Sequence, residues 1–460
     1  MKLQHKNYTL YQHQGETCQF IAPKHRAYIA STMGCGKTLC IIHDVDRFLQ
    51  QNPGKKVLIL APKSLLHSVW EAEFNQFTPW IHVSVGTAPA AKREAAFAKP
   101  ADVYITNIDA LDWLAKKPPG FFTDYDYIAI DEATSIKNNT ARTKAAQKIK
   151  KYFNIRRLLS GTPTAGPLID LFYQYLFLDD GVSLKTNSYY KFRQVMMYAK
   201  QNGPHPNMKT WHNKPGMEQV VAQWVKDITI RYVLEEVVNM PPKVVAPYRY
   251  KPNAKVELAY KKMLHQAELQ LQSGTITAIN AASLTTKLLQ IASGAVYDEN
   301  GNVHLVDTQR YELVLDIVNN TPHAVVFYNW RSQREFMMDL ASKRGIDATF
   351  IDGTVNNTKR KERVNDFQAG KYKVIFLQVK AASHGLTLTK AYTTIWSCPS
   401  YLADYYQQAN ARVYRIGQKH RTLTINIEAE NTLDGIVYSK LNGKINDIDL
   451  LNAAIRANRI

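Results

Sequence analysis

The sequence predicts an α/β protein with two doubly wound parallel-sheet lobes joined by a small helical bridge. Short, almost wholly apolar strands recur along the chain, and a helical pattern follows each one, as expected for strands covered on both faces of a parallel sheet. The alternation forms two series, separated by a stretch in which it fails. A length of 460 residues is also too great for one ordinary core and fits two domains.

The first series begins with the apolar run Ala27–Ala30 and a helix expected from Lys37 to Gln50, which stops at the turn-forming Asn52–Gly54. Further strands are expected at Lys56–Ala61, Asp102–Asn107, Tyr127–Glu132 and Arg157–Pro163. Ligands of doubly wound sheets bind at the carboxyl ends of the strands, and the polar residues of this series fall there.

The second series lies in the C-terminal part of the chain and has five expected strands. They cover His323–Tyr328, Ala348–Thr354, Lys373–Leu377, Tyr392–Trp396 and Leu423–Ile427. Between the two series, helical patterns at Lys255–Gln272 and Ala278–Ile291 predict an all-helical bridge. The expected domains are therefore an N-terminal lobe at 1–178, a linker and bridge at 179–307, and a C-terminal lobe at 308–460.

The composition favours a globular protein with a polyanionic partner. Lys and Arg number 58 against 39 Asp and Glu, a net charge of +19, although a generally basic surface would give the same count. Met1–Gln14 is polar and the apolar strands are too short to cross a bilayer, so we expect a cytoplasmic protein without a membrane partner. Four cysteines without a C-x-x-C pair predict no structural zinc.

The stretch Ser31–Thr38 predicts a phosphate-binding loop between a buried strand and a helix. Gly34 and Gly36 permit positive φ angles, which bring several backbone N–H groups toward one anion, and the next helix points its partly positive N-terminus at the same place. Lys37 would contact the β and γ phosphates of a nucleotide, and Thr38 would offer its hydroxyl to Mg²⁺. Ser31 replaces the usual first glycine.

Two further features complete the predicted nucleotide site. Gln14, shortly before the first strand, is a candidate for hydrogen bonding to an adenine edge, although an exposed glutamine is the ordinary alternative. The adjacent carboxylates Asp131 and Glu132 end a buried strand, where they are costly unless they meet a cation such as Mg²⁺ on Asp131. Glu132 would then deprotonate the attacking water. The residues expected to contact the nucleotide in this lobe are Gln14, Met33, Gly34, Cys35, Gly36, Lys37 and Thr38.

The second lobe has no phosphate loop of its own but carries the pair Arg412 and Arg415. Residues three apart lie on one helical face and can reach a single phosphate together. The pair suits arginine fingers presented to the nucleotide of the other lobe. A solvated or nucleic-acid-facing helix would show the same bare pattern.

A polar, proline-rich region in the middle of the chain interleaves basic and aromatic residues. It comprises Gln201–Pro206 and Lys209–Gly216. This composition suits contact with the backbone and bases of nucleic acid, and a plain surface loop is an equally open interpretation.

Taken together, these stretches resemble the SNF2-like group of superfamily 2 DNA helicases and translocases, from about Tyr8 to Asp434. The motifs that carry the resemblance are Met33–Thr38, Asp131–Asn138, Leu159–Pro163 and, most specifically, Arg412–Gln418. The resemblance implies two RecA-like lobes that close on ATP and a motor that tracks along duplex DNA. Departures are Ser31–Thr32, where the family often has an acidic pair, and Thr134, where a histidine is usual. The short insertions suggest a minimal viral or bacterial motor.

The resemblance also implies further site residues. Those expected along the DNA track are Lys63, Ser64, Thr106, Asn107, Asn329, Trp330 and the stretch Lys380–Gly385. Lys or hydroxyl groups at strand ends can hold phosphates without reading sequence. Gly385 and Gln408 join the expected nucleotide contacts of the second lobe, and the expected catalytic set is Lys37, Asp131, Glu132, Arg412 and Arg415.

The sequence therefore predicts a monomeric, DNA-stimulated ATPase that uses ATP and Mg²⁺, translocates on duplex DNA and remodels or unwinds forked or branched DNA, in the host cytoplasm if the protein is viral. True strand separation would need a wedge, for which Trp211 or the loop around it is a candidate. An ATP-gated DNA clamp without productive hydrolysis and an RNA-directed helicase are the alternatives.

Overall fold

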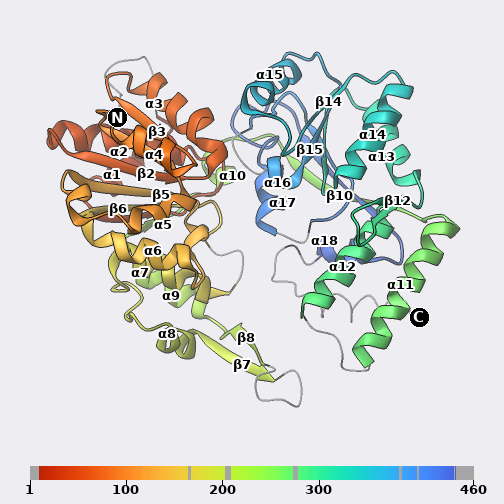
Figure 1. Ribbon diagram of the computed structural model, residues 1–460, viewed down its shortest axis with the longest axis horizontal. Helices are drawn as coiled ribbons and strands as arrows, with labels where there is room; N and C mark the ends of the chain where they lie inside the picture. Colours follow the sequence, from red (N-terminus) through yellow and green to blue (C-terminus); the bar gives the residue numbers. More distant parts are fainter. Residues whose placement is uncertain are drawn as a thin grey trace. The chain divides into compact units, whose positions relative to one another are not determined.

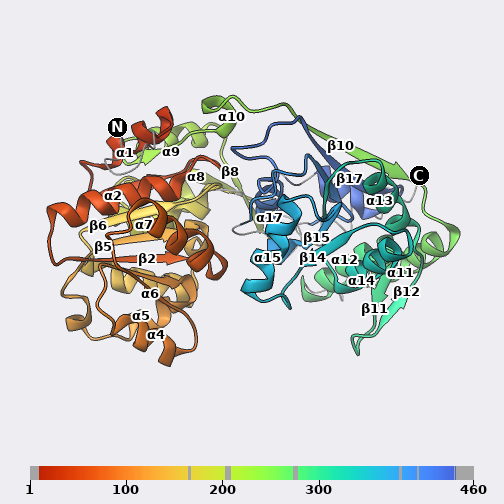
Figure 2. The ribbon, with the colours of Figure 1, turned by 90° about the horizontal axis from the view of Figure 1, so that it is seen from above.

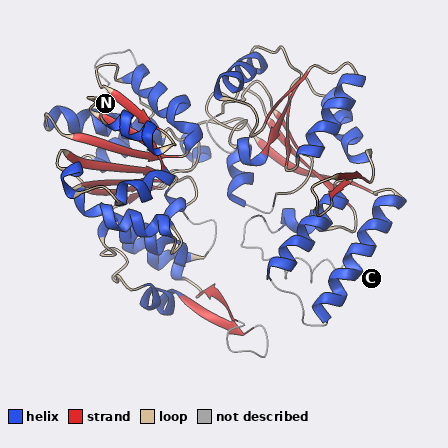
Figure 3. Ribbon diagram, in the orientation of Figure 1, coloured by secondary structure: helices blue, strands red, loops and turns tan. Residues whose placement is uncertain are grey.

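The computed structural model describes residues 10–163, 167–201, 209–272, 278–382, 386–400, 403–439 and 441. The chain divides into two compact units, Met1–Asn239 and Met240–Ile460. Each unit contains one large parallel sheet with helices packed on it (Figures 1 and 3). The predicted α/β class with two parallel-sheet lobes is therefore confirmed.

The sheet of the first unit has seven strands in the order β3-β4-β2-β5-β6-β1-β9, and every pair in it is parallel. Its strands are β1 (Arg26–Ile29), β2 (Lys56–Ala61), β3 (Val83–Gly86), β4 (Val103–Asn107), β5 (Tyr125–Asp131), β6 (Ile155–Leu159) and β9 (Thr229–Ile230). The central strands are buried on both faces, which is why they read as continuous apolar runs in the sequence.

Helices cover both faces of this sheet and create two apolar cores. One face carries α1 (Gln12–Ile21), α2 (Lys37–Gln51) and α3 (Ala72–Phe77). The other carries α4 (Ala90–Phe97), α5 (Leu111–Ala115), α6 (Ala141–Ile149), α7 (Phe172–Asp179), α8 (Tyr189–Met196) and α9 (Met217–Val225). Figure 2 shows α2 on one side of the sheet and α5 and α6 on the other.

A buried ion pair crosses from the sheet to the helix that follows the phosphate loop. Arg157 on β6 donates from Nε to Asp44 Oδ2 of α2 at 2.9 Å, and both side chains are almost fully buried. The Tyr127 hydroxyl of β5 donates to the same oxygen at 2.8 Å. Arg157 also donates to the carbonyl of Ile21 at the end of α1. These bonds fix α1 and α2 against β5 and β6.

The second unit has a six-stranded parallel sheet in the order β10-β17-β16-β13-β15-β14. Its strands are β10 (Lys243–Tyr250), β13 (Ala324–Tyr328), β14 (Ala348–Ile351), β15 (Val374–Gln378), β16 (Thr393–Trp396) and β17 (Thr422–Ala429). The helices are α11 (Ala254–Gln272), α12 (Ala278–Ala292), α13 (Gln309–Asn319), α14 (Arg331–Lys343), α15 (Asn357–Gln368), α16 (Val379–Ala382), α17 (Ala403–Asn410) and α18 (Leu433–Ser439). No helix within the described ranges is both long and apolar enough to span a membrane.

The two helices expected in the bridge are present as α11 and α12. The segment 179–307 also contributes β9 to the first sheet, β10 to the second, and two hairpins, which the sequence did not predict. The hairpins are β7 (Met197–Gln201) with β8 (Lys209–Asn213), and β11 (Ala295–Tyr297) with β12 (Val303–Leu305). These strands are short, exposed or at sheet edges, so they lack the apolar run that marks a buried strand. The boundaries at 178 and 307 stay a prediction.

We predict that Arg157→Ala lowers the free energy of unfolding by roughly 3–5 kcal/mol, because it leaves the Asp44 carboxylate buried without its main cation. Equilibrium urea unfolding measures this change. Arg47→Ala is the matched control, because Arg47 donates to the other oxygen of Asp44 from a side chain that is 27% exposed. The control should lose less than about 1 kcal/mol. Equal losses in the two variants would contradict the assignment.

Candidate active site

The predicted phosphate loop occupies the turn between β1 and α2. Gly34 has φ 87° and Gly36 has φ 74°, so both glycines adopt the left-handed conformation that the motif requires. A Cβ atom at Gly36 would lie 2.1 Å from Gln14 Nε2, so this position has no room for a side chain either. The helix α2 begins directly afterwards at Lys37, and its first N–H groups have no acceptor inside the helix.

Lys37 lies within the loop, where its Nζ donates to the carbonyls of Ser31 at 2.8 Å and Thr32 at 3.1 Å. Burial lowers the pKa of Lys37 below its ordinary value, and the carboxylates of Glu132 and Asp131 act in the opposite direction. Lys37 therefore lies near enough to the acidic pair for both carboxylates to act on its pKa. The structure brings together these three predicted catalytic residues of the first unit.

The acidic pair stands at the carboxyl end of β5. Asp131 is 7% exposed, and its Oδ2 accepts a hydrogen bond from the indole Nε1 of Trp70 at 3.0 Å. Its Oδ1 accepts from the backbone N–H of Glu132 at 3.0 Å. Glu132 has φ 57°, a left-handed conformation that costs a non-glycine residue energy and concentrates at active sites. Because of this conformation, the Glu132 side chain leaves the backbone in a different direction from that of a residue in a continued strand.

The stretch after β6, which contains the predicted motif Leu159–Pro163, contacts the phosphate loop. Ser160 is fully buried, and its backbone N–H donates to the carbonyl of Ile29 at 3.2 Å. A Cβ atom at Gly161 would lie 2.9 Å from Met33 Cγ, so Met33 packs directly on Gly161. The third predicted motif therefore touches the first.

Two residues of α1 pack against the loop from the other side. Gln14 is 3% exposed, and its Nε2 donates to the carbonyl of Cys35 at 3.4 Å. The His13 Nε2 lies 3.0 Å from the same carbonyl oxygen. The sequence selected Gln14 and missed His13, because a histidine in an amphipathic helix carries no specific signal. Contact of Gln14 with adenine stays a prediction.

The end of the first unit also binds the phosphate loop. The N–H of Tyr232 donates to Ser31 Oγ at 3.0 Å, and the N–H of Leu234 donates to Thr32 Oγ1 at 2.8 Å. In return, the N–H of Thr32 donates to the carbonyl of Tyr232 at 2.8 Å. We call residues 228–234 the clasp. The clasp contains β9 and leads into α10 (Leu234–Val237), just before the chain enters the second unit.

These features fit a bound nucleotide with a divalent cation. The glycine conformations and the helix N-terminus present N–H groups to an anion. Lys37 adds a positive charge, and Thr38 with Asp131 supplies oxygen atoms of the kind that Mg²⁺ prefers.

The predicted DNA-track residues of the first unit divide into two kinds. Lys63 is exposed and opens a short 3₁₀ helix, Lys63–Leu65, with Ser64 half-buried beside it. Thr106 and Asn107 are buried instead, and their side chains bond within the unit. Thr106 Oγ1 donates to the carbonyl of Gly86 at 2.7 Å, and Asn107 Oδ1 accepts from Arg93. The structure therefore gives Thr106 and Asn107 internal partners, and their contact with DNA stays a prediction.

The two predicted arginine fingers are not on one helical face, so this part of the expectation is wrong. Helix α17 ends at Asn410, and residues 411–416 form turns. The N–H groups of Arg412 and Val413 donate to carbonyls three residues earlier, those of Ala409 and Asn410, and tertiary hydrogen bonds are added to these turns. The N–H of Leu388 donates to the carbonyl of Arg412 at 2.9 Å, and Arg415 Nη1 donates to Thr387 Oγ1 at 2.8 Å. Both arginine side chains are half-buried.

Gln418 holds these turns in place. Its Nε2 donates to the carbonyls of Thr389, Ala391 and Val413, and its Oε1 accepts from the N–H groups of Lys419 and His420. The side chain is 5% exposed. The last residue of the most family-specific string is thus a structural bridge.

The other predicted residues of the second unit lie at the ends of strands or on short helices. Asn329 follows β13, and its Nδ2 donates to the carbonyl of Pro399 at 2.8 Å. Trp330 precedes α14 and is half-buried against the apolar cluster of α11 and α12. Lys380 is exposed on α16, and Gln408 is 6% exposed on α17. Gly385 lies outside the described residues.

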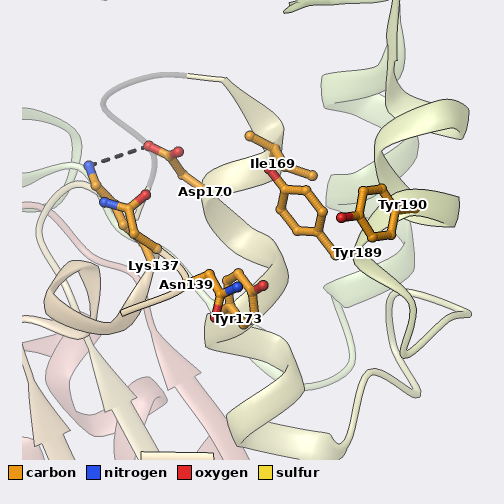
Figure 4. Close-up of a pocket in the computed structure, with 8 residues that line it drawn as sticks. Lys137, Asn139, Ile169, Asp170, Tyr173, Tyr189 and Tyr190 are labelled. Atoms are coloured by element: carbon orange, nitrogen blue, oxygen red, sulfur yellow. Dashed lines mark ion pairs between the residues drawn. The ribbon is translucent and has the colours of Figure 1, made fainter. Parts of the chain in front are cut away.

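A cavity of about 310 Å³ lies beside the loop that follows the acidic pair (Figure 4). Its lining is Lys137, Asn138, Asn139, Ile169, Asp170, Tyr173, Tyr189 and Tyr190. Lys137 and the buried Asp170 form an ion pair at 3.3 Å, and the rings of Tyr173 and Tyr189 stack at 5.7 Å. The cavity is lined by residues of the second motif and by residues of α7 and α8. None of the residues predicted to contact the nucleotide lines it.

Sequence reasoning missed two groups of positioning residues. Trp70 lies 61 positions before the carboxylate that it contacts, and the clasp lies about 200 positions after the loop. Contacts between residues so far apart in the sequence leave no local sequence pattern. A tryptophan in an amphipathic segment ordinarily signals only a core position.

We predict that Thr32→Val frees the backbone amide of Leu234, because valine keeps the shape of threonine but cannot accept the hydrogen bond. Hydrogen exchange at Leu234 should accelerate by roughly 10-fold or more relative to the wild type. Thr17→Val is the control, because Thr17 bonds only within α1, to the carbonyl of His13. Unchanged exchange at Leu234 would show that the side chain of Thr32 does not hold the clasp.

Two family descriptions cover most of the chain. An SNF2-related domain matches residues 11–293, and a helicase conserved C-terminal domain matches residues 309–417. A protein called p41 of Acyrthosiphon pisum secondary endosymbiont phage 1 is 26% identical over 459 residues, covering 94% of this chain and 95% of that protein. An uncharacterized ATP-dependent helicase of Mycoplasma pneumoniae is 26% identical, covering 94% of this chain but 41% of its own length.

Among solved structures, the SWI2/SNF2 ATPase core of Sulfolobus solfataricus in complex with dsDNA has a TM-score of 0.45 and 20% identity. The match covers 100% of this chain and 96% of that core. The resemblance inferred from the motifs is confirmed by the domain matches, which account for both units. The chain belongs to the SNF2-related family and is a helicase-like ATPase.

Proposed function

We propose that this ATPase is stimulated by DNA, translocates on duplex DNA and remodels or unwinds forked or branched DNA. The observation that carries the proposal is the convergence of Lys37, Asp131 and Glu132 at the carboxyl edge of the first sheet, where the phosphate loop already has an anion-binding shape. Family membership supports ATP use, and the net charge of +19 supports a polyanionic track.

The residues of the loop divide the work of binding. The N–H groups from Gly34 to Thr38 would hold the phosphates, and Lys37 would neutralise their charge. Thr38 and Asp131 would hold Mg²⁺. When bound, ATP supplies the γ-phosphoryl group and the metal ion neutralises charge that develops during its transfer.

The acidic pair has two separate roles in this proposal. The Trp70 indole donates a hydrogen bond to one oxygen of Asp131, which fixes the orientation of this carboxylate. Glu132 extends from a strained backbone and would accept a proton from the attacking water. Arg412 and Arg415 of the second unit stay predicted partners of the same nucleotide.

Translocation would follow from cycles in which the two units close and open around one ATP per step. The exposed Lys63 and Lys380 are candidates to hold phosphates of the track, because lysine contacts the backbone of DNA without reading its sequence. DNA in duplex, forked or branched form is the proposed partner, and the protein would act as a monomer.

ATP turnover measured with single-stranded, duplex, forked and Holliday-junction DNA, and with RNA, tests this function. We predict a rise with DNA and the largest rise with duplex-containing substrates. Lys37→Ala should lower turnover by roughly 100-fold or more, because the charge facing the phosphates is lost. Lys55→Ala, an exposed lysine just after α2, should not change it. If no DNA stimulates the wild type, the proposal is refuted. If RNA alone stimulates it, the substrate is RNA instead of DNA.

We predict that Trp70→Phe lowers ATP turnover by roughly 10-fold, because Asp131 loses the donor that orients it while an aromatic ring is kept at the buried position. Trp80→Phe is the control, since Trp80 also donates to a carboxylate, Asp46, but is 41% exposed and belongs to no predicted motif. Thermal unfolding of both variants separates activity from stability. Equal turnover in the two variants would remove Trp70 from the site.

A further inference from the structure

The hairpin β7–β8 forms a two-stranded ribbon beside α8, and Figure 1 shows it leaving the body of the first unit. Its register pairs Tyr198 with His212 and Lys200 with Thr210. Successive side chains of a strand point to opposite faces, so these four residues share one face of the ribbon. We call it the outer face.

The opposite face anchors the ribbon to the unit. Met197 is 2% exposed, and Trp211 packs against the same apolar core. The guanidinium of Arg193 on α8 lies 4.1 Å from the centre of the Trp211 ring, and Asn213 Oδ1 accepts from the N–H of Leu168 at 3.0 Å. Trp211 is therefore a fixed support of the ribbon and is poorly placed to act as a wedge.

The outer face carries an exposed aromatic pair. Tyr198 is 47% exposed, and its ring stacks on that of His212 with centroids 5.7 Å apart and an interplanar angle of 29°. The Thr210 hydroxyl lies 3.0 Å from His212 Nε2, which fixes the imidazole. A ring pair held on a hydrogen-bonded ribbon is a platform on which a further planar group can stack.

The segment that carries this platform is basic, and the carboxylate bonded to the ribbon, that of Glu218, accepts from Asn213 Nδ2 on the opposite face at 2.9 Å. From residue 181 to residue 217 the sequence has no Asp or Glu and six Lys or Arg. Lys191, Lys200 and Lys209 are exposed, with the last two on the ribbon itself. A polyanion with planar groups matches such a surface, because lysine holds phosphates and aromatic rings stack on bases.

We propose that the outer face of the β7–β8 ribbon binds DNA at forks, stacking an unpaired base on the Tyr198–His212 pair while Lys200, on the same face, holds an adjacent phosphate. This inference rests on the proposed function, because it adds a structure-selective contact to a DNA motor. The proposed partner is unpaired DNA, since the bases inside a duplex are stacked on each other and offer no free face to the Tyr198–His212 pair.

The test measures the affinity of the full chain for a labelled fork and for a blunt duplex of equal length, by fluorescence anisotropy at several salt concentrations. Tyr198→Ala combined with His212→Ala should weaken fork binding by roughly 5- to 100-fold and duplex binding by less than about 2-fold. Tyr248→Ala, which removes a tyrosine that is 42% exposed on β10 of the second unit, is the matched control.

Lys200 has a separate signature. Lys200→Ala should reduce the slope of log affinity against log salt by about 0.7 to 0.9, as expected for one lost phosphate contact. Lys92→Ala, which removes the same charge from an exposed position on α4, is the control. Thermal unfolding of every variant verifies that weaker DNA binding is not caused by unfolding of the protein.

The outcomes separate this inference from the proposed function. If the wild type binds DNA and is stimulated by it, yet the aromatic variant binds the fork as tightly as Tyr248→Ala does, the inference fails alone. If fork and duplex binding fall together, the ribbon is a general phosphate contact and the stacking assignment is wrong. If polyglutamate competes with the fork as well as unlabelled DNA does, an acidic protein is the partner instead. A wild type without DNA binding refutes both.

Discussion

The buried pair of Arg157 and Asp44 is the constraint on which the active-site geometry depends. It joins the strand next to the acidic pair with the helix that follows the phosphate loop, so Lys37 and Asp131 come from elements with a fixed mutual position. A buried ion pair of this kind adds little net stability relative to an apolar core, but removal of either partner leaves a buried charge unpaired. The second unit repeats the device with Arg310 and Asp434, which are also buried and bonded.

The phosphate loop is supported by bonds from distant parts of the first unit. Helix α1 reaches the carbonyl of Cys35, the strand end at Gly161 packs on Met33, and the clasp bonds to Ser31 and Thr32. The clasp is also the last segment before the chain passes into the second unit. The phosphate loop is therefore hydrogen-bonded directly to the backbone that leads out of the unit.

Much of the fold was predictable because the central strands are buried on both faces and read as apolar runs. The phosphate loop and the acidic pair were also predictable, since each is a short contiguous motif. The turns at Arg412 were not, because the spacing of the motif does not show where α17 ends or that Leu388 and Gln418 bond to the backbone beyond it. Edge strands such as β9 were missed for a related reason, since two residues paired to a distant strand leave no periodicity.

The departure at Ser31 and Thr32 has a physical explanation in the clasp. Both hydroxyls accept backbone N–H groups, a task that the carboxylates of an acidic pair would also perform, so the exchange keeps the acceptors and removes two negative charges. Ser31 is 2% exposed, where a carboxylate would be costly to bury. With neutral residues there, the carboxylates that favour the charged form of Lys37 are those of Glu132 and Asp131. The positive charge of the loop is thereby balanced by the two carboxylates predicted to be catalytic rather than by the residues that open the loop.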